Sequence, residues 1–411
     1  MLAIQYLKSI PRFLAVRGLG TFWKGAATSR FGCAQLREIA PPPLPNERWL
    51  RLRPILAGIC GSDLATITAR NTPYFSPLLS YPFTLGHELV GRVEEVGAAV
   101  EGVARGDKVL VEPALSCAVR GIEPPCPMCQ AGHAACCLNI MHGAISPGIQ
   151  TGYCRDTGGG WSESLVVHER QVLRAPEETP DEALVLVEPL SCAVHAALKV
   201  ACPAAGTALV LGCGAIGLLL TFALRTLGNP GRIIAVHRYP HQAAFARVFG
   251  ADCLVQDGPG VEEEIAALTR AERRKPEIGG SVFLGGVDVT YDCVGSSGSL
   301  DQALRYTRAL GAVAVVGMPG VPRGLDWTAI WYKELRVVGT YAYGLEEYAG
   351  ERLRTFELAA RLARRHAAKL APLVGARYPL REFPAAIASA RFSGRSGVVK
   401  TVFEVTPEGR L

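Results

Sequence analysis

The sequence of 411 residues predicts an α/β protein with two domains. Short β-like runs separated by Pro and Gly fill residues 35–167, which indicates a β-rich domain. From Ala183 the sequence pattern changes, because apolar strand-like runs now alternate with helical stretches, as in βαβ units on a parallel sheet. This alternation ends near Gly339, so the last residues are free to return to the first domain. We expect one domain at 1–188, completed by 341–411, and a second at 189–340.

These sequence patterns predict the individual strands and helices. In the β-rich domain the clearest strand-like runs are Trp49–Leu56, Gly91–Gly97 and Lys108–Glu112, and the long loops are Asn71–Thr84 and Pro113–Arg155. In the second domain the expected strands are Thr207–Leu211, Arg232–Val236, Val287–Cys293 and Ala312–Val316, and the expected helices are Ile216–Leu227, His241–Phe249 and Leu300–Ala309. After them, Glu346–Lys369 has the pattern of one long helix.

Composition excludes several classes of protein. Hydrophobic residues make up 49% and charged residues 19%, which is too apolar for a disordered chain. No run approaches the roughly 20 uncharged apolar residues of a membrane-spanning helix. The net charge of +6 includes no basic block of five, so we expect neither nucleic-acid nor membrane binding.

The N-terminal composition and the cysteines indicate in which cellular compartment the protein is expected. The first 37 residues carry six basic side chains and no acidic one, a composition that a transit peptide and an ordinary basic pair of strands share. We favour the pair of strands and expect a cytoplasmic protein. The 13 cysteines are then expected to be reduced thiols or metal ligands rather than disulfides.

A glycine-rich loop predicts a dinucleotide site. Gly212, Gly214 and Gly217 form a GxGxxG that follows an apolar strand and opens a helix. The first glycine makes a tight turn, the second admits a pyrophosphate, and the third lets the helix pack on the strand. The phosphates then sit at the helix N-terminus, formed with Ala215 and Ile216.

The ribose position differs from the usual NAD pattern. An acidic residue is expected about 20 residues after the glycines, where it binds ribose hydroxyls. Here the chain has His237 and Arg238 and no acid. A cation suits a 2′-phosphate, so we favour NADP over NAD; alternatively, Arg238 points into solvent.

Scattered residues offer metal-binding chemistry. Cys60 precedes Gly-Ser-Asp, His87-Glu88 follows a glycine 26 residues later, and Glu188 lies just before the second domain. A thiolate, an imidazole and carboxylates are ligands that Zn²⁺ prefers. Spacing alone does not link them, and each could be an ordinary packed or surface residue.

A denser cysteine cluster predicts a structural zinc. Cys126, Cys129 and Cys137 have the C-x2-C-x7-C spacing of a knuckle, with Cys117 and Cys136 nearby. The alternative is a group of unligated buried cysteines.

Over essentially its full length the chain resembles the zinc-dependent medium-chain alcohol dehydrogenases, in particular their polyol, threonine and glucose dehydrogenase branch. The ordered motifs that carry this resemblance are Cys60-Gly-Ser-Asp63, Gly86-His-Glu through Gly97, Gly106-Asp-Lys-Val109, Gly159-Gly-Trp-Ser-Glu163, Glu188-Pro-Leu190 and the glycine loop. The resemblance implies a GroES-like catalytic domain and a Rossmann domain with a doubly wound parallel sheet. It also implies hydride transfer between an alcohol and NAD(P).

The resemblance implies a set of catalytic-zinc ligands. Cys60, His87 and Glu188 would surround the ion, and Glu88 would be a fourth ligand or an exchangeable carboxylate beside it. Cys192 competes with Glu188, although it lies closer to the glycine loop than the family pattern allows. Glu at the third position is typical of family members that use polyols, sugars or amino alcohols.

Two further residues receive roles from the resemblance. Asp63 would orient His87, and Ser62 would carry the proton of the alcohol outward. Substrate-lining segments would be Asn71–Tyr81, Pro147–Trp161 and Tyr341–Tyr348.

The chain departs from the family in its structural-zinc motif. The first cysteine of the usual C-x2-C-x2-C-x7-C falls at Glu123. Either Glu123 supplies an oxygen, which register favours slightly, or Cys117 reaches in from upstream. In addition, residues 14–36 are longer than the usual N-terminal hairpin, and no function follows from their sequence.

Two other functions compete with this prediction. One is a zinc-free quinone or enoyl reductase of the same superfamily, and the other is a non-catalytic dinucleotide-binding protein. The presence of Cys60, His87 and Glu188 together disfavours both. We therefore expect an enzyme with a small alcohol or carbonyl substrate, assembled as a homodimer or homotetramer through the sheet edge near Trp331–Thr340.

Overall fold

The computed structural model describes residues 1–20, 22–228 and 231–406, and it divides into two compact units. Unit 1 comprises Met1–Glu188 and Tyr343–Leu411, and unit 2 comprises Pro189–Ala342. The second junction lies two residues beyond the position expected from the sequence.

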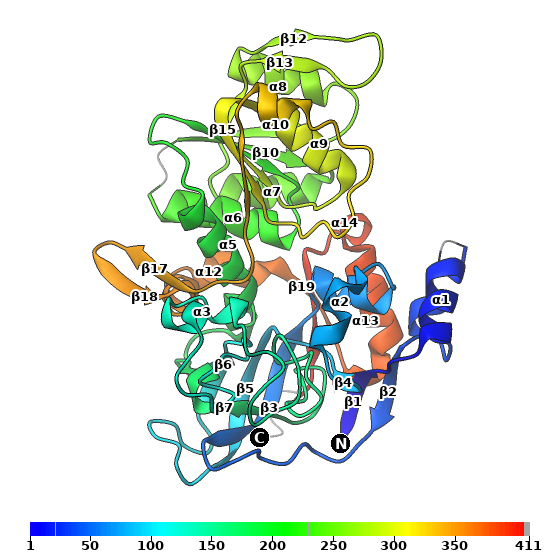
Figure 1. The fold of residues 1–411 in the computed structure, drawn as a ribbon, viewed down its shortest axis with the longest axis vertical. Helices are drawn as coiled ribbons and strands as arrows, with labels where there is room; N and C mark the ends of the chain where they lie inside the picture. Colours follow the sequence, from blue (N-terminus) through cyan, green and yellow to red (C-terminus); the bar gives the residue numbers. More distant parts are fainter. Residues whose placement is uncertain (21, 229–230, 407–411) are drawn as a thin grey trace. The chain divides into compact units, whose positions relative to one another are not determined.

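Unit 1 contains two main sheets (Figure 1). The smaller has the order β2-β1-β4, formed by β1 (Leu2–Tyr6), β2 (Ala34–Glu38) and β4 (Phe83–Thr84). The larger has the order β19-β20-β3-β5-β6-β8, with β7 also paired to β3. Its strands are β3 (Trp49–Gly58), β5 (Leu89–Val96), β6 (Lys108–Val111), β7 (Leu165–His168), β8 (Val172–Arg174), β19 (Val374–Tyr378) and β20 (Lys400–Glu404).

The C-terminal strand closes this unit. β20 pairs antiparallel with β3, so that Val402 lies opposite Gly58 and Glu404 opposite Leu56. Phe403 of β20 also packs against Trp161, with ring centroids 5.0 Å apart. Both ends of the chain therefore build one core.

The expected long helix over 346–369 is wrong in its first half. Residues 345–354 form a hairpin of β17 (Leu345–Tyr348) and β18 (Glu351–Arg354), and only then does α11 (Thr355–Arg365) begin. Tyr348 pairs with Glu351, which leaves Ala349 and Gly350 as a two-residue turn with φ of 52° and 81°. Positive φ at both positions is typical of the tight turns that match strand twist.

Helices and short 3-10 turns (η) complete unit 1. They are α1 (Ile10–Leu19), η1 (Ala26–Thr28), α2 (Gly61–Ile67), η2 (Pro73–Leu78), α3 (Pro127–Gln130), η3 (Ala134–Cys136), η4 (Glu169–Gln171), α4 (Asp181–Leu184), α12 (Ala367–Leu370), η5 (Ala371–Leu373), η6 (Leu380–Glu382), α13 (Phe383–Arg391) and α14 (Ser393–Ser396). The N-terminal pair of strands is present, but α1 and η1 separate β1 from β2.

Unit 2 is a parallel sheet with the strand order β11-β10-β9-β14-β15-β16. Its strands are β9 (Thr207–Leu211), β10 (Arg232–His237), β11 (Cys253–Gln256), β14 (Val287–Asp292), β15 (Thr307–Val315) and β16 (Arg336–Gly339). This order is that of the doubly wound dinucleotide-binding fold, which confirms the expected fold class.

The other elements of unit 2 are helices and one hairpin. They are α6 (Ala215–Thr226), α7 (Pro240–Val248), α8 (Val261–Thr269), α9 (Ser297–Tyr306), α10 (Thr328–Tyr332), β12 (Glu272–Arg274) and β13 (Val282–Leu284), while α5 (Val187–Lys199) crosses the first junction. Leu209, Ile234 and Val313 of the sheet are completely buried in the core of this unit.

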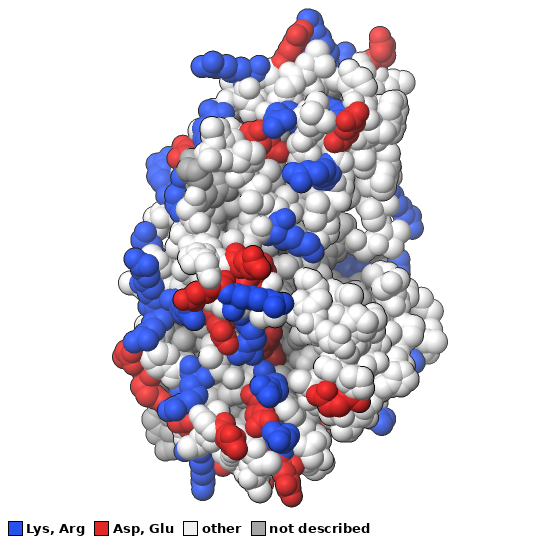
Figure 2. Space-filling view, turned by 60° about the vertical axis from the view of Figure 1, so that its left-hand side comes forward, with Lys and Arg blue, Asp and Glu red and all other residues white. Residues whose placement is uncertain are grey.

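On the face shown in Figure 2, Lys and Arg side chains lie among Asp and Glu rather than in one block. Within the described residues, no helix combines the length and the apolar character needed to cross a membrane.

Candidate catalytic metal site and nucleotide loop

A cluster of metal-ligating side chains lies at one end of the large sheet of unit 1. β3 and β5 are antiparallel neighbours, so the residues after β3 meet the residues before β5. The backbone N–H of Gly58 donates to the carbonyl oxygen of Glu88 at 2.7 Å, and this contact fixes the approach. As a result, ligand atoms of Cys60, His87 and Glu88 all lie within 4.8 Å of one another.

Gly86 shapes the turn that presents His87. Its φ is +97°, and a Cβ built there would lie 2.4 Å from Cδ1 of Trp161. Trp161 is fully buried, and its indole N–H donates to the carbonyl oxygen of Gly58 at 2.9 Å. A side chain at 86 would therefore displace the tryptophan that holds the two ligand-bearing segments together.

Asp63 contacts both segments that carry the candidate metal ligands, the one with Cys60 and the one with His87. Its carboxylate accepts a hydrogen bond from the backbone N–H of Cys60 at 3.0 Å, and its other oxygen lies 3.5 Å from Nδ1 of His87. Burial lowers the pKa of His87, but the charges of Asp63 and Cys60 and the hydrogen bonds with them together outweigh this effect, so the pKa lies well above its usual value. Asp63 has no exposed surface, which makes it a fixed carboxylate beside the imidazole.

Tyr153 and Thr66 extend this contact. The Tyr153 hydroxyl donates to Asp63 at 3.4 Å and lies 3.1 Å from the hydroxyl of Thr66. Asn71 in turn donates to Thr66. These groups fix the carboxylate that faces His87.

Lys400 of β20 forms a buried ion pair with Glu88. The two side chains are 4% and 1% exposed, so solvent does not screen the pair. Burial lowers the pKa of Lys400, yet the charges of Glu88, Cys60 and Glu188 outweigh it and raise this pKa. Lys400 was not predicted from the sequence, because 312 residues separate it from Glu88 and no motif marks it.

Glu188 lies at the start of α5, outside the compact set of three. Burial raises its pKa to about 7, although the charges of His87 and Lys400 and a hydrogen bond with Tyr343 act in the opposite direction. Cys192 follows one turn later in α5 and does not belong to the compact set either. Ser62 is half-buried beside Cys60 and its carbonyl oxygen accepts a hydrogen bond from Thr66 at 2.9 Å.

The donor set fits a divalent metal. Three buried carboxyl groups, those of Asp63, Glu88 and Glu188, and the half-buried thiol of Cys60 gather around one imidazole, with Lys400 as the ammonium partner of Glu88. Buried like charges are costly unless a cation compensates them. A zinc ion, which takes sulfur, nitrogen and oxygen ligands, would supply that charge.

A second cluster consists of four cysteines between β6 and β7. The sulfur atoms of Cys117, Cys126, Cys129 and Cys137 lie within 4.8 Å of one another. Cys117 and Cys137 are 3.6 Å apart, and Cys126 and Cys137 are 4.0 Å apart. A tetrahedron with Zn–S bonds of about 2.3 Å has edges of about 3.8 Å, so these separations fit a structural zinc.

Cys117, and not Glu123, completes this cluster, which corrects the register-based preference. Glu123 is exposed, whereas Cys117 is fully buried. The chain turns back after Cys117, whose carbonyl oxygen accepts from the N–H of Ile122 at 3.0 Å. This turn brings the Cys117 sulfur against the backbone N–H of Cys126, at 3.3 Å.

Several N–H groups point at these sulfur atoms. Leu138 donates to Cys126 at 3.4 Å, and Asn139 donates to Cys137 at 3.4 Å and to Cys117 at 3.3 Å. Burial raises the pKa of Cys126, but the backbone N–H groups of Leu138 and Cys129 and the neighbouring thiols lower it to about 6. Burial raises the pKa of Cys137 to about 11. The sulfurs therefore cannot all ionise near neutral pH without a cation among them.

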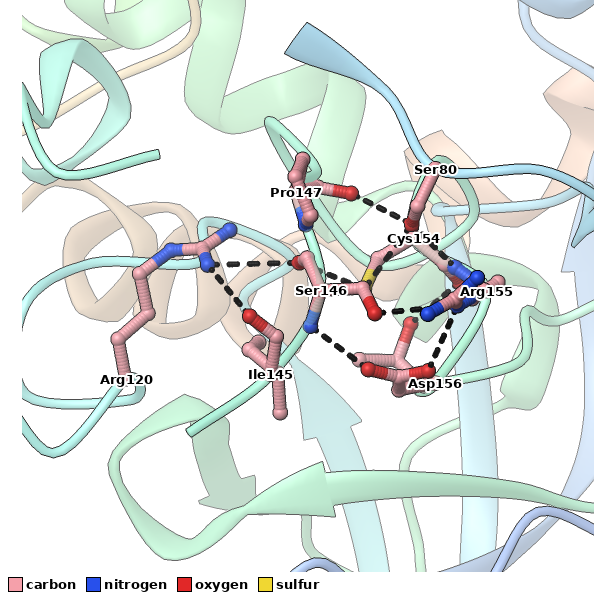
Figure 3. Close-up of polar contacts among 9 residues, drawn as sticks. Ser80, Arg120, Ile145, Ser146, Pro147, Cys154, Arg155 and Asp156 are labelled. Atoms are coloured by element: carbon pink, nitrogen blue, oxygen red, sulfur yellow. Dashed lines mark hydrogen bonds and ion pairs between the residues drawn. The ribbon is translucent and has the colours of Figure 1, made fainter. Parts of the chain in front are cut away.

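A buried arginine fixes the loop beside this cluster (Figure 3). Arg120 has no exposed surface, and its guanidinium donates to the carbonyl oxygens of Leu115, Ile145 and Gly148 at 3.1, 3.2 and 2.7 Å. The same loop is held from its other side by Asp156, which accepts from the N–H of Ser146 at 2.6 Å. These contacts attach the segment that precedes Tyr153 to the loop that carries Cys117, Cys126, Cys129 and Cys137, which we call the cysteine lobe.

In unit 2 the glycine loop joins β9 to α6 as expected. Gly212 has a φ of +89°, and a Cβ on Gly217 would lie 1.8 Å from the carbonyl oxygen of Gly212. Gly214 has no neighbour within 4 Å of a built Cβ, which leaves room for a phosphate to approach. Ala215 and Ile216 begin α6, so their N–H groups face the same space.

The end of β10 carries three polar side chains. Arg238 forms an ion pair with Asp257, with distances of 3.1 and 2.6 Å from its Nε and Nη2 atoms. Nδ1 of His237 and Nε2 of His241 are buried without a hydrogen-bond partner among the described residues. Asp257 and His241 were not predicted from the sequence, because Asp257 directly follows the next strand, β11, and His241 is the second residue of α7.

Comparisons with known proteins agree with this arrangement. Residues 46–177 match the family model of the alcohol dehydrogenase GroES-like domain, and residues 215–357 match that of zinc-binding dehydrogenase. L-idonate 5-dehydrogenase of Vitis vinifera is 29% identical over 308 residues, which are 74% of this chain and 76% of that protein. Sorbitol dehydrogenase of Arabidopsis thaliana is 30% identical over 294 residues, 72% of this chain and 74% of that protein. The X-ray structure of 2R,3R-butanediol dehydrogenase from Bacillus subtilis covers 99% of this chain and 100% of its own, with a TM-score of 0.70 and 23% identity.

A GroES-like unit with a cluster of metal ligands and a Rossmann unit with a dinucleotide loop define a zinc-dependent, NAD(P)-linked oxidoreductase. The chain belongs to the zinc-dependent medium-chain alcohol and polyol dehydrogenase family.

Proposed function

We propose that the protein oxidises a polyol or a related secondary alcohol, with NADP as the preferred hydride acceptor. The observation that carries this proposal is the compact set of Cys60, His87 and Glu88, whose ligand atoms lie within 4.8 Å of one another. The names of its relatives, which include sorbitol, L-idonate and butanediol dehydrogenases, support the substrate class.

Each residue of the metal site has a proposed role. Cys60 and His87 would hold the zinc ion, with Glu88 or Glu188 as the carboxylate ligand. When bound, zinc supplies a Lewis acid that lowers the pKa of a coordinated hydroxyl group. Asp63 fixes the imidazole of His87 through the contact at 3.5 Å. Ser62, half-buried next to Cys60, would carry the proton of the alcohol outward.

The cysteine lobe would hold a second, structural zinc. Cys117, Cys126, Cys129 and Cys137 provide four thiolates, and a closed site of this kind stabilises the fold directly. The N–H donors on its sulfurs support this role, since they stabilise the thiolate form.

The preference for NADP rests on the end of β10. The guanidinium of Arg238 offers charged donors to a 2′-phosphate, and the imidazoles of His237 and His241 lie at the same end of the strand. Asp257 partly neutralises Arg238 and competes with the phosphate. We expect Arg238→Ala to raise KM for NADP about tenfold, with little change for NAD, because a charge-assisted hydrogen bond contributes about 1.5–3 kcal/mol. Equal changes for both cofactors would refute the preference.

We further propose a homodimer, or a tetramer built from such dimers, through the edge of the unit 2 sheet. β16 is the edge strand, and the side chains of Val337, Trp331 and Tyr332 beside it are 41%, 69% and 62% exposed. Large exposed apolar groups beside an unpaired edge are typical of a subunit interface.

The test of the proposed function is a panel of polyols assayed with NADP and NAD on zinc-loaded protein. We expect His87→Ala to abolish turnover and to leave NADP binding unchanged, since His87 lies in unit 1 and the glycine loop in unit 2. His142→Ala, which removes an exposed histidine, is the matched control. A competing zinc-free reductase would retain its activity after chelation and in the His87 variant.

A further inference from the structure

The N-terminal segment carries the net charge of the whole chain. Its first 37 residues contain six basic side chains and no acidic one, and the formal net charge of the protein is +6. The rest of the chain is therefore balanced. The proposed dehydrogenase chemistry does not account for this segment, which includes α1 and η1.

This segment contributes to a pocket whose charged lining is entirely basic. Arg17 and Lys24 come from the segment, Arg70 follows α2, and Arg391 ends α13. The pocket has a volume of about 230 Å³, enough for a small molecule or part of one. No acidic residue lines it.

The inner lining of the pocket is apolar and ordered. Val16, Ala27 and Ala69 are buried there, at 3% exposure each. Ala69 has a φ of +54°, and the left-handed turn it makes is closed by the N–H of Arg70, which donates to the carbonyl oxygen of Ala65 at 2.8 Å. The fold thus directs Arg70 to the pocket through a conformation that alanine adopts at a cost of roughly 1 kcal/mol.

Two of the cations are held in place by neighbouring groups. Nη1 of Arg391 donates to the carbonyl oxygen of Lys24 at 2.6 Å. Nζ of Lys24 and the guanidinium of Arg391 lie 5.0 and 5.7 Å from the centroid of the Phe392 ring. Burial lowers the pKa of Arg391, and the charge of Arg70 lowers it further, so these two guanidinium groups repel each other.

The four cations have no acidic partner in the described part of the chain. Elsewhere in this protein, arginines such as Arg92 and Arg354 form ion pairs with glutamates at 2.7 and 2.8 Å. Arg17 and Arg391 lie in the last turns of their helices, where a cation is favourable by about 0.3–1 kcal/mol. The helix C-terminus accounts for each of these two cations by itself. It does not account for four cations that line one pocket without an acidic residue.

We propose that this pocket is a binding site for the phosphoryl group of a small ligand. Arginine presents paired N–H donors that match phosphate oxygens, and three of the four cations are arginines. A concavity lined by one sign of charge also concentrates its field on a ligand of the opposite sign. A phosphoryl dianion would relieve the repulsion between Arg70 and Arg391.

The helix α2 connects the pocket to the metal site, which leaves two possible sources for the phosphoryl group. Cys60 is the N-cap of α2, and Thr68 and Arg70 line the pocket just beyond the other end of this helix. Seven residues of helix span about 10 Å. The phosphoryl group could therefore belong to a phosphorylated substrate or to free phosphate that acts through α2.

The test is a titration of full-length, zinc-loaded protein with inorganic phosphate. The readout is the rise in melting temperature, and chloride salt keeps the ionic strength constant. We expect saturable stabilisation. Arg17→Gln with Arg70→Gln should raise the Kd for phosphate at least about 100-fold, since two charge-assisted hydrogen bonds are lost. Neither side chain supports another element by a hydrogen bond or ion pair between described residues, so the double variant keeps the fold. Arg30→Gln, in the same segment but outside the pocket, is the matched control.

The glycine loop of unit 2 can also bind phosphate, but it is identical in all these proteins, so their difference isolates the pocket. An unchanged Kd in the double variant overturns the proposal. A second assay compares a polyol with its phosphate ester as substrates. A rise in KM confined to the ester identifies a substrate site, whereas unchanged KM values with weakened phosphate binding identify a separate effector site. The phosphate titration does not depend on dehydrogenase activity, so its outcome is distinct from that of the proposed function.

Discussion

Replacing Lys400 with methionine removes the ammonium partner of a buried carboxylate. Lys400 and Glu88 are in direct contact, and their side chains are 4% and 1% exposed. Methionine has a similar length, so the perturbation is electrostatic rather than a cavity. Glu88 is then left in the interior beside Cys60 and Glu188, both of which raise the pKa of Lys400 in the wild type.

The burial of the pair decides the expected magnitude. An exposed ion pair contributes about 0–1 kcal/mol, because water screens it. Removing one partner of a buried pair costs about 3–5 kcal/mol, because the remaining charge is uncompensated. We expect Lys400→Met to lower the free energy of unfolding by this larger amount. Adding Glu88→Gln should recover at least about 2 kcal/mol, since the orphaned charge is gone.

The assay is urea unfolding of metal-free protein, in which no zinc ion compensates Glu88, monitored by tryptophan fluorescence. Trp49 and Trp161 are fully buried in unit 1 and report its unfolding, whereas Trp327 and Trp331 of unit 2 are 63% and 69% exposed. A cost below about 1 kcal/mol for Lys400→Met would contradict the reasoning. So would a double variant that is no more stable than the single one.

Three further predictions concern the structural zinc, the catalytic zinc and the pH dependence of stability. Cys117→Ser should reduce bound zinc by one ion per chain, whereas Glu123→Gln should leave the zinc content unchanged, as measured by metal analysis. Tyr153→Phe removes a hydroxyl that contacts Asp63 and should weaken zinc binding at the catalytic site by about 10–100-fold, as measured by chelator competition. In zinc-free protein, Glu188 has a pKa of about 7 when folded, against 4.5 when unfolded, so the folded state retains a proton that the unfolded chain releases. Stability should therefore fall by about 3 kcal/mol as pH rises from about 4 to 8, and Glu188→Gln should remove this dependence.

These outcomes have internal controls. Loss of zinc from the Glu123 variant, with full retention in the Cys117 variant, would restore the oxygen-ligand alternative. Tyr153→Phe should not change zinc binding in the cysteine lobe, so an equal loss at both sites would indicate general unfolding. If the pH dependence of the Glu188 variant matches that of the wild type, another group carries it.

The fold was predictable wherever local pattern decides structure. The strand before Gly212 and the helix after Gly217 form a unit whose glycines are required by backbone geometry, so the motif specifies the loop. The hairpin at 345–354 was not predictable in this way, because its charged residues suit an exposed helix or an edge strand. The turn at Ala349-Gly350 decided the outcome.

The candidate sites were predictable only in part, because chemistry gathers residues that are far apart in sequence. Cys60 and His87 could be paired through the family resemblance, since each belongs to a motif. Lys400 could not, because a lone lysine in an apolar strand has no signature until β20 pairs with β3. Likewise, register favoured Glu123 over Cys117, and only the turn after Cys117 shows which side chain reaches the other sulfurs.

The most direct test of the account is hydride transfer from polyols to NADP by zinc-loaded protein, compared with the same protein after chelation and with Cys60→Ala. The account predicts turnover that chelation abolishes and zinc restores. It also predicts none in the Cys60 variant, which should still bind NADP with wild-type affinity. Turnover that persists without zinc, or in Cys60→Ala, would contradict the central claim that Cys60 and His87 hold the catalytic metal.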